Sequence, residues 1–278
     1  MGVDVLEIDF SEKMLIAQDL SGVGDLSLTV ALPILQVQKI PLAILPTSLL
    51  STQSEGFETP ATLYSQSFVA QTFAHWQAQK IKVTAALVGY IADLTIGNEI
   101  YNYLKNNSFK LIVIDPVFAD EGNFYPKLDQ KHIELQKKLI NLADVTTPNI
   151  TEARFLSGLK DETNLKKLVK AVEQLMPSEG KAVITGVELD GKKGCVWLEN
   201  DELKTCLLSK LDGHFYGSGD VFSALLAGFL RKGVPFSQAV LQATTLTSEA
   251  LEKTSEKKFE RRYGIYLGEL LPKLARGE

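Results

Sequence analysis

Long apolar runs without polar alternation recur along the chain, separated by stretches of helical length. Continuous apolar runs of this kind are typical of strands covered on both faces, as in parallel sheets. Residues 13–20 and 181–186 are the clearest examples. The full set of predicted strands is 13–20, 41–52, 81–93, the run FKLIVID, the short run ADVTT, and 181–186.

Helical spacing follows several of these strands. The stretch that begins with the glycine turn at 21–24 runs on as an apolar segment of helical length and stops before Pro41, and helical spacing is also present over 62–79. Near the carboxyl terminus the predicted helices are 221–232, 235–252 and 263–275. Strands that alternate with helices predict one α/β domain with right-handed crossovers. We expect a single domain over residues 1–278, with 1–12 as a leader of uncertain status.

Composition narrows the functional class. The chain has 278 residues, 45% of them hydrophobic, and a formal net charge of -5. No basic stripe is available to neutralise a nucleic-acid backbone, which argues against a nucleic-acid partner. No apolar stretch is long enough to span a bilayer, and no signal-peptide pattern opens the chain. We therefore expect a soluble cytoplasmic protein without a membrane partner. The charged run at 257–262 is interpreted as a solvated helix face.

Two cysteines fall in a predicted hairpin. If Asn200 and Asp201 form a two-residue loop between apolar runs at 194–198 and 203–208, Cys195 and Cys206 lie directly opposite each other. A disulfide is then geometrically conceivable. We expect reduced structural thiols, because cytosolic disulfides are rare and no neighbouring His completes a metal set.

The stretch GHFYGSGD at 213–220 runs directly into an apolar helical segment. Small residues allow the backbone to bend, and the N-terminus of the following helix favours an anion such as phosphate. Asp220 would then lie in the first helical turn, where it can act as a base that deprotonates an attacking alcohol. The structural alternative is ordinary turn chemistry before a helix.

Acidic residues follow a buried strand. Asp115 ends the fourth predicted strand, and Asp120 and Glu121 come shortly after in a polar loop. Unpaired buried carboxylates are costly, so magnesium or phosphate chemistry is a better explanation than packing. Further along, Thr151 is a candidate helix cap. Glu152 either complements the helix dipole or holds a hydrated Mg²⁺.

Polar side chains also follow the second predicted strand. Hydroxyl and amide groups gather between Thr47 and residue 54, and 56–62 has the composition of an exposed flap. Tyr90, at the end of the third predicted strand, is placed either to stack on a planar ring or to pack in the core. Ligands of open α/β sheets bind at these strand ends.

Four blocks, LIVIDPVFADEGNFY, TTPNITEARFLSG, AVITG and YGSGDVFSALLAGFL, resemble the successive signatures of the ribokinase-like superfamily, in its vitamin-kinase branch. Their order and spacing match over essentially the whole chain. Within that branch, SGVGDLSLTVALPIL and PLAILPTSLLSTQSEGF resemble the two N-terminal substrate blocks of bacterial pyridoxal kinases.

The resemblance implies a three-layer α/β/α sandwich with a predominantly parallel central sheet, and transfer of the ATP γ-phosphoryl group to the 5′-hydroxymethyl of pyridoxal, pyridoxine or pyridoxamine. It also implies Mg²⁺, with K⁺ as a candidate second cation, and a homodimer. The implied catalytic residues are Asp220 as general base and Gly217, Ser218 and Gly219 as anion hole. The implied nucleotide-side residues are Asp115, Asn149, Glu152, Thr185 and Ser218, with Asp115 and Glu152 near the metal, through water. The implied substrate-side residues are Ser21, Thr47, Tyr90 and Asp220, and the implied lid is Asp120, Glu121 and Gly122.

Departures from the family pattern lie on the substrate side. Gln53 stands where His is frequent, and Asp25 and Leu26 replace the usual Arg and Cys. These changes leave vitamer preference open, and His214 is assigned either to a supporting or to a surface role. Two alternatives remain: a hydroxymethylpyrimidine kinase of thiamine synthesis, where Cys is frequent at the position of Asp220, and a non-catalytic ligand-binding relative.

Overall fold

The computed structural model describes residues 9–277, so residues 1–8 of the expected leader lie outside the described residues. A central sheet of nine strands has the order β11-β10-β9-β8-β5-β4-β1-β2-β3. The pairings from β2 through β9 are parallel, whereas β3 at one end of the sheet and β10 and β11 at the other pair antiparallel. The strands are β1 (Lys13–Ser21), β2 (Leu42–Leu50), β3 (Thr62–Tyr64), β4 (Val83–Val88), β5 (Leu111–Ile114), β8 (Val145–Thr146), β9 (Lys181–Leu189), β10 (Lys192–Glu199) and β11 (Glu202–Ser209).

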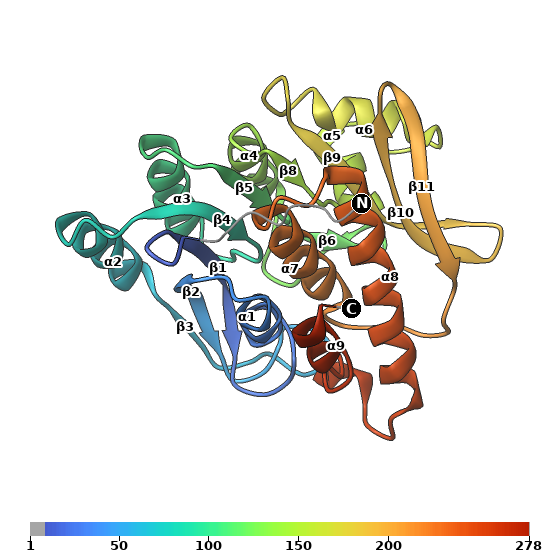
Figure 1. Ribbon diagram of the computed structural model, residues 1–278, viewed down its shortest axis with the longest axis horizontal. Coiled ribbons are helices and arrows are strands. Elements are labelled where there is room, and N and C mark those ends of the chain that lie inside the picture. The colour runs from blue at the N-terminus through green and yellow to red at the C-terminus, as the bar shows by residue number, and fades with distance from the viewer. Residues whose placement is uncertain (1–8, 278) are drawn as a thin grey trace.

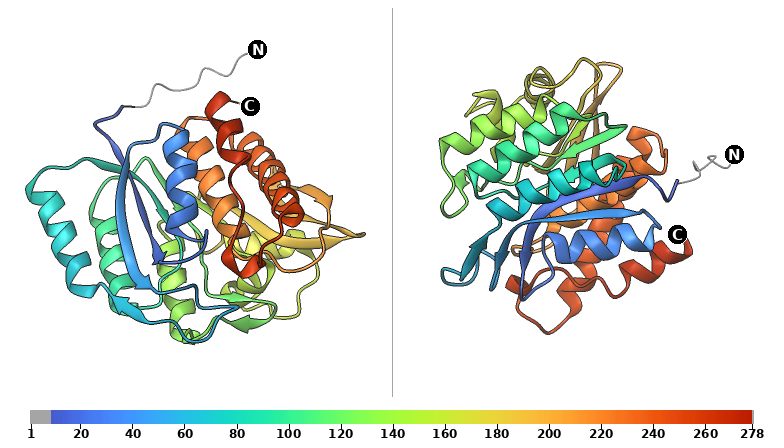
Figure 2. Two further views of the ribbon diagram at one scale, coloured as in Figure 1. Left: turned by 90° about the horizontal axis from the view of Figure 1, so that it is seen from below. Right: turned by 90° about the vertical axis from the view of Figure 1, so that its left-hand side faces the viewer.

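Helices cover both faces of this sheet (Figure 1 and Figure 2). One layer contains α1 (Leu28–Val37), α7 (Ser218–Arg231), α8 (Phe236–Glu256) and α9 (Leu270–Arg276). The other contains α2 (Gln66–Ala78), α3 (Leu94–Asn106), α4 (Gln130–Ile140), α5 (Ile150–Ser157) and α6 (Leu165–Glu173). The architecture is therefore the expected α/β/α sandwich with a mostly parallel sheet.

Strand β1 shows why the apolar runs lack alternation. Met14 and Ile16 pack in the core beneath α1 and α7, whereas Leu15 and Ala17 pack in the core on the opposite face. All four side chains are fully buried. Because successive side chains of a strand point to opposite faces, a strand covered on both sides must be apolar at every position.

The predicted cysteine hairpin is confirmed. β10 and β11 pair antiparallel with Cys195 directly opposite Cys206, and both thiols are free and buried. Cys195 Sγ lies 3.0 Å from Thr244 Oγ1 on α8. Burial raises the pKa of the Cys195 thiol to about 12, so it is protonated at neutral pH.

Three local predictions were wrong. Residues 62–64 form the edge strand β3 rather than the start of a helix. The 263–275 segment is not one helix: a short 3₁₀ turn, Arg261–Tyr263, is followed by an extended stretch, and α9 begins only at Leu270. Gly264 adopts a φ of 97°, which interrupts the helix there. The charged run at 257–262 lies in this irregular segment after α8, not on a helix face.

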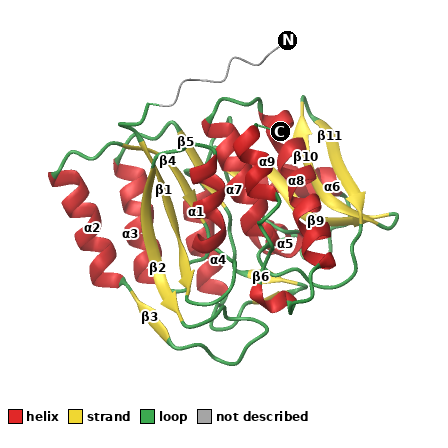
Figure 3. Cartoon of the chain, turned by 60° about the horizontal axis from the view of Figure 1, so that its bottom comes forward, coloured by secondary structure: helices red, strands yellow, loops and turns green. Residues whose placement is uncertain are grey.

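The carboxyl ends of the parallel strands meet along one edge of the sheet. In Figure 3 the β1 and β2 arrows point toward the edge where a small hairpin, β6 (Ala119–Asp120) and β7 (Asn123–Phe124), lies beside the main sheet. Residues 120–122 were expected in a loop; Asp120 instead ends β6, and Glu121 and Gly122 form the turn of this hairpin. The single-domain organisation stays a prediction. No helix within residues 9–277 is long and apolar enough to cross a membrane.

Candidate active site

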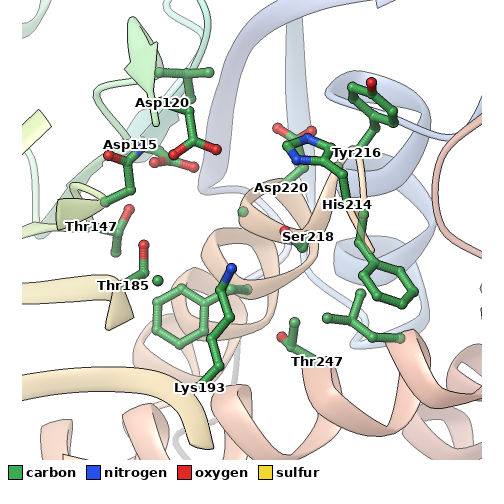
Figure 4. Close-up of a pocket in the computed structure, with 18 of the residues that line it drawn as sticks. Asp115, Asp120, Thr147, Thr185, Lys193, His214, Tyr216, Ser218, Asp220 and Thr247 are labelled. Atoms are coloured by element: carbon green, nitrogen blue, oxygen red, sulfur yellow. The ribbon is translucent and has the colours of Figure 1, made fainter. Parts of the chain in front are cut away.

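A cavity of about 710 Å³ lies at the carboxyl edge of the sheet. Polar residues at the carboxyl ends of several strands line it, including Asp19 near the end of β1, Asp115 after β5 and Thr147 after β8. The loop that precedes α7 also lines the cavity and brings Ser218 and Asp220 to it (Figure 4). Asp115 lies close to the first turn of α7, with its Oδ2 4.0 Å from where a Cβ on Gly219 would be. This is the position at which open α/β sheets bind their ligands.

The glycine-rich segment 213–217, which we call the glycine loop, ends at the N-terminus of α7, as predicted. Gly217 is the N-cap of α7, with a φ of 86°. The positive φ favours glycine, and a Cβ at this position would also lie in tight contact with the carbonyl oxygen of Asp25, at 3.1 Å. Ser218, Gly219 and Asp220 form the first helical turn, whose N–H groups lack partners within the helix. The turn is therefore built to receive an anion.

Asp220 is buried and its carboxylate is held by a distant loop. The N–H of Ser27 donates to Asp220 Oδ2 at 2.9 Å. Burial raises the pKa of Asp220 to about 8, with further contributions from the charges of Asp115 and Asp19. An acid with a pKa near neutrality is well matched to a general base.

Asp115 and Glu152 are both buried, but they differ in their partners. Burial raises the pKa of Asp115 to about 7. Glu152 Oε1 accepts the N–H of Phe118 at 2.8 Å, and Oε2 accepts the N–H of Asn149 at 2.9 Å. Burial, and then the charge of Asp115, raise the pKa of Glu152 well above its ordinary value. Both acids line the cavity, and Glu152 in addition fixes the loop after β5.

Asn149, not Thr151, caps α5. Its side chain accepts the N–H of Glu152 at 3.0 Å, and Glu152 returns the contact in a capping box. The Asn149 amide also donates to the carbonyl of Ala119 at 2.6 Å. The hydroxyl of Thr151 instead accepts the N–H of Gly122 at 3.0 Å and ties the β6–β7 hairpin to α5.

Two threonine hydroxyls in the cavity wall form no hydrogen bond of ordinary geometry within the described chain: Thr147 Oγ1, which follows β8 and faces the Asp115 carboxyl, and Thr247 Oγ1 on α8. Thr185 also lines the cavity and forms a backbone bridge with Asn149. Buried polar atoms in native proteins are nearly always satisfied, so orphan hydroxyls in a cavity indicate a polar ligand.

The predicted substrate residues divide into two groups. Tyr90 lines the cavity, and burial raises the pKa of its phenol above the ordinary value. Thr47 lies behind this wall and donates to the Tyr90 carbonyl at 3.0 Å. Ser21 lies behind it as well, 3.5 Å from Asp19 Oδ2. Neither Ser21 nor Thr47 is among the lining residues, so the structure places them in support of Tyr90 and Asp19.

The predicted lid residues lie at the mouth of the cavity. Glu121 and Gly122 form the two-residue turn of the β6–β7 hairpin with φ values of 47° and 83°, as a tight hairpin turn requires. Asp120 and Glu121 line the cavity. Glu121 lies 3.9 Å from His214 Nδ1, and the His214 ring packs against Tyr216. The hairpin therefore touches the glycine loop across the mouth.

Sequence analysis missed several lining residues. Asp19 was predicted only as part of an apolar strand. In the structure it lines the cavity, and burial raises its pKa to about 6. Its position at the end of a strand was the available signal. Lys193 on β10 points its ammonium group into the cavity between Thr185 and Ser218 (Figure 4). Glu55 lines the cavity from the loop after β2.

The acids provide oxygen ligands of the kind that Mg²⁺ prefers. Among residues 9–277, however, no three His, Cys, Asp or Glu side chains come together as a ligand set. Mg²⁺ keeps most of its waters and takes few protein ligands, usually together with substrate phosphates. The buried carboxylate of Asp115, beside the orphan hydroxyl of Thr147, fits such a hydrated ion.

Comparisons with known proteins agree with this geometry. The family model described as phosphomethylpyrimidine kinase matches residues 41–264. The crystal structure of pyridoxal kinase from Lactobacillus plantarum is 35% identical with a TM-score of 0.91, over 95% of this chain and 96% of that chain.

Curated relatives match over a shorter span. Pyridoxal kinase of Arabidopsis thaliana is 29% identical over 194 residues, which cover 64% of this chain and 60% of the relative. A hydroxymethylpyrimidine/phosphomethylpyrimidine kinase of Staphylococcus aureus is 30% identical over 184 residues, covering 62% of this chain and 64% of the relative. The chain thus spans less than two thirds of the length of these curated relatives.

Proposed function

The chain belongs to the phosphomethylpyrimidine kinase family of the ribokinase-like superfamily, and on that premise we propose that it transfers the γ-phosphoryl group of ATP to the 5′-hydroxymethyl of a B6 vitamer. The observation that carries this proposal is the position of Asp220. Its buried carboxylate lies in the first turn of α7, beside an anion-binding helix terminus and inside a cavity large enough for two ligands.

Asp220 acts as the general base. It accepts the proton of the vitamer hydroxyl while the alcohol oxygen forms its bond to the γ-phosphorus and the bond between phosphorus and the leaving oxygen of ADP breaks. The N–H groups of Gly217, Ser218 and Gly219 form the anion hole that stabilises charge on the transferred group. Ser27 keeps the Asp220 carboxylate oriented through its N–H.

Nucleotide and metal bind on the other side of the cavity. Thr147, Thr185, Lys193 and Thr247 supply hydroxyl and ammonium groups for the phosphates and the nucleoside. Asp115 would hold Mg²⁺ through water, with Glu152 behind it as the acid that fixes the loop. Magnesium supplies positive charge that neutralises the phosphate oxygens during transfer. A K⁺ requirement stays a prediction to which no residue is assigned.

The vitamer lies between Tyr90 and Asp220. Tyr90 offers an aromatic face at the end of β4, and Ser21 and Thr47 support that wall from behind. Asp120, Glu121 and Gly122 form a lid that closes the mouth over the ligands. A homodimer and a cytoplasmic location remain predictions from the resemblance and the sequence.

The second candidate is phosphorylation of hydroxymethylpyrimidine. The family description and the Staphylococcus aureus relative favour it. Both substrates are primary alcohols on flat nitrogen heterocycles, so the same base and anion hole serve either. The presence of Asp rather than Cys at position 220 favours the B6 assignment, and it also argues against a non-catalytic binding protein.

The deciding experiment measures ADP release with Mg-ATP against pyridoxal, pyridoxine, pyridoxamine, hydroxymethylpyrimidine and ribose. Preference for the B6 vitamers, lost in Asp220→Asn, supports the proposal. Turnover with hydroxymethylpyrimidine alone replaces the substrate and keeps the mechanism. Tight binding of pyridoxal without turnover of any alcohol supports the binding-protein alternative.

A further inference from the structure

The segment between α8 and α9 contacts three separate loops of the cavity. We call residues 260–265 the strap, and residues 51–61, between β2 and β3, the flap. The strap is anchored at its end, because Ile265 is fully buried and the next residue, Tyr266, donates its N–H to Thr254 Oγ1 on α8 at 3.0 Å. In Figure 1 this red segment lies alongside the blue loop that follows β1.

The first contact joins the strap to the flap. Arg262 Nη1 donates to the Gly56 carbonyl at 3.2 Å, and its guanidinium lies 4.6 Å from the ring centre of Phe57. In return, the side chain of Gln53 donates to the Arg262 carbonyl. A Cβ on Gly56 would lie 2.9 Å from Arg262 Cβ, which shows how closely the two backbones approach. Gln53 and Glu55 of the flap line the cavity.

The second contact joins the strap to the glycine loop. The Arg261 guanidinium donates to the carbonyl of Asp212 and lies 4.0 Å from the ring centre of Phe215. Both residues lie in the segment that leads to the Gly217 cap of α7. Arg261 therefore supports the segment that forms the anion hole.

The third contact is made by backbone. The N–H of Asp25 donates to the Tyr263 carbonyl at 2.8 Å, and the Asp25 carbonyl accepts the N–H of Ile265 at 3.3 Å. Two residues further on, the N–H of Ser27 holds Asp220. One short segment thus fixes the flap, the glycine loop and the loop that orients the base.

We propose that the strap is a positioning element that couples the alcohol side of the cavity to the phosphate side, with Arg262 as the positioning residue for the flap and Arg261 for the glycine loop. Neither arginine lines the cavity, so each acts through the loop that it holds. The proposal rests on the proposed function, since it assigns the flap to the alcohol and the glycine loop to the phosphate.

The coupling is tested first without turnover, by hydrogen exchange of the flap in the full-length protein. Arg262→Ala should speed exchange over residues 53–60, whereas Lys258→Ala should leave it unchanged. Lys258 is the matched control because it is exposed and makes no hydrogen bond or ion pair in the described part of the chain.

Adding Mg-ADP should slow flap exchange in the wild type and in Lys258→Ala, but not in Arg262→Ala. Unchanged exchange in Arg262→Ala, or equal slowing by Mg-ADP in all three proteins, overturns the proposal.

Kinetics provides the second readout. Arg262→Ala should raise KM for pyridoxal roughly tenfold at unchanged KM for ATP, because it removes the charge-assisted hydrogen bond to Gly56 and the contact with Phe57, together with an ion pair to Glu260 within the strap. Arg261→Ala should instead lower kcat and raise KM for ATP. Arg262→Lys keeps the charge but loses the planar fork, so it should resemble Arg262→Ala. A rise in both KM values by the same factor in Arg262→Ala contradicts the division of roles.

The two proposals fail differently. Faster flap exchange in a protein that phosphorylates no alcohol would contradict the proposed function and leave the strap in place. Normal kinase activity with normal KM values in Arg261→Ala and Arg262→Ala would contradict the strap alone.

Discussion

The N–H of Ser27 donates a hydrogen bond to Asp220 Oδ2 at 2.9 Å, although the two residues are 193 positions apart in sequence. Ser27 has a φ of 48°, a conformation that non-glycine residues seldom adopt. The hydroxyl of Thr29 stabilises this turn by accepting the N–H of Leu26 at 2.9 Å. Backbone strain of this kind persists where the surrounding structure requires it, and here it directs one N–H at the base.

The role of Asp220 is tested by Asp220→Asn. The amide keeps the size of the side chain but cannot accept the alcohol proton, so turnover should fall about 10²–10⁴-fold. Binding of Mg-ADP, measured by calorimetry, should change little, because the nucleotide is held from the opposite wall. A variant that retains full turnover would remove Asp220 from the mechanism.

The buried acids also make stability depend on pH. The pKa values of Asp220, Asp115 and Asp19 rise from 3.8 to about 8, 7 and 6, chiefly through burial. Between pH 4 and pH 8 the folded state therefore binds more protons than the unfolded state, and stability falls as pH rises. The Tm should drop from pH 5 to pH 8.5 without ligand, and the drop should be smaller in Asp220→Asn.

Adding magnesium tests whether the buried carboxyls cause this pH dependence of Tm. A cation near Asp115 favours the ionised acids, so Mg²⁺ with ADP should raise Tm more at pH 8 than at pH 6. A Tm that is flat between pH 5 and 8.5, in the absence of ligand, would show that these carboxyls do not titrate differently in the folded state.

Elements with a local cause could be predicted from sequence. The buried strands, the cysteine hairpin and the turn at Gly217 each depend on a few adjacent residues, and the structure has all three. The glycine loop placed Asp220 in the first turn of a helix for the same reason. A resemblance spread over several separated blocks then supplied the family.

Features that depend on distant segments could not be predicted in this way. Ser27 has no local signal that marks it as a partner of Asp220, because the contact exists only after the sheet has formed. Charges at 257–262 are equally compatible with a helix face and with a strap, and tertiary contacts of Arg261 and Arg262 decided between them. Thr151 has a good capping side chain, but Asn149 occupies the position at which α5 begins.

The neighbouring residues Thr147 and Thr146 allow a matched comparison of two valine variants. Thr146 Oγ1 donates to the Ile114 carbonyl at 2.9 Å, whereas Thr147 Oγ1 faces the Asp115 carboxyl without a hydrogen bond of ordinary geometry within residues 9–277. Because Thr147 lacks a hydrogen bond of ordinary geometry, Thr147→Val should change the free energy of unfolding little. Thr146→Val should cost about 1 kcal/mol. Chemical denaturation measures both free energies of unfolding.

The two valine variants should also differ in their affinity for Mg-ADP. Thr147 lines the cavity, so Thr147→Val should weaken the binding of Mg-ADP while the protein becomes no less stable. Thr146→Val should leave nucleotide affinity unchanged. Equal nucleotide affinity in wild type and Thr147→Val would show that this hydroxyl meets water rather than ligand.

Replacing Gly217 by alanine should have two separate effects, backbone strain and a tight contact with Asp25. Gly191, where only the strain applies, allows the two effects to be distinguished. Both glycines have positive φ, 86° at Gly217 and 72° at Gly191, so alanine strains either backbone by about 1–2 kcal/mol. A Cβ at Gly191, in the turn between β9 and β10, meets nothing within 4 Å. At Gly217 it lies 3.1 Å from the Asp25 carbonyl and must displace the loop that carries Ser27. Gly191→Ala should therefore lose stability but keep kcat, whereas Gly217→Ala should lose more stability and at least tenfold in kcat, because Asp220 loses its aligned N–H donor. Steady-state kinetics beside denaturation curves of the two variants measures this difference, and equal kcat values would show that the close approach of Gly217 to Asp25 has no part in catalysis.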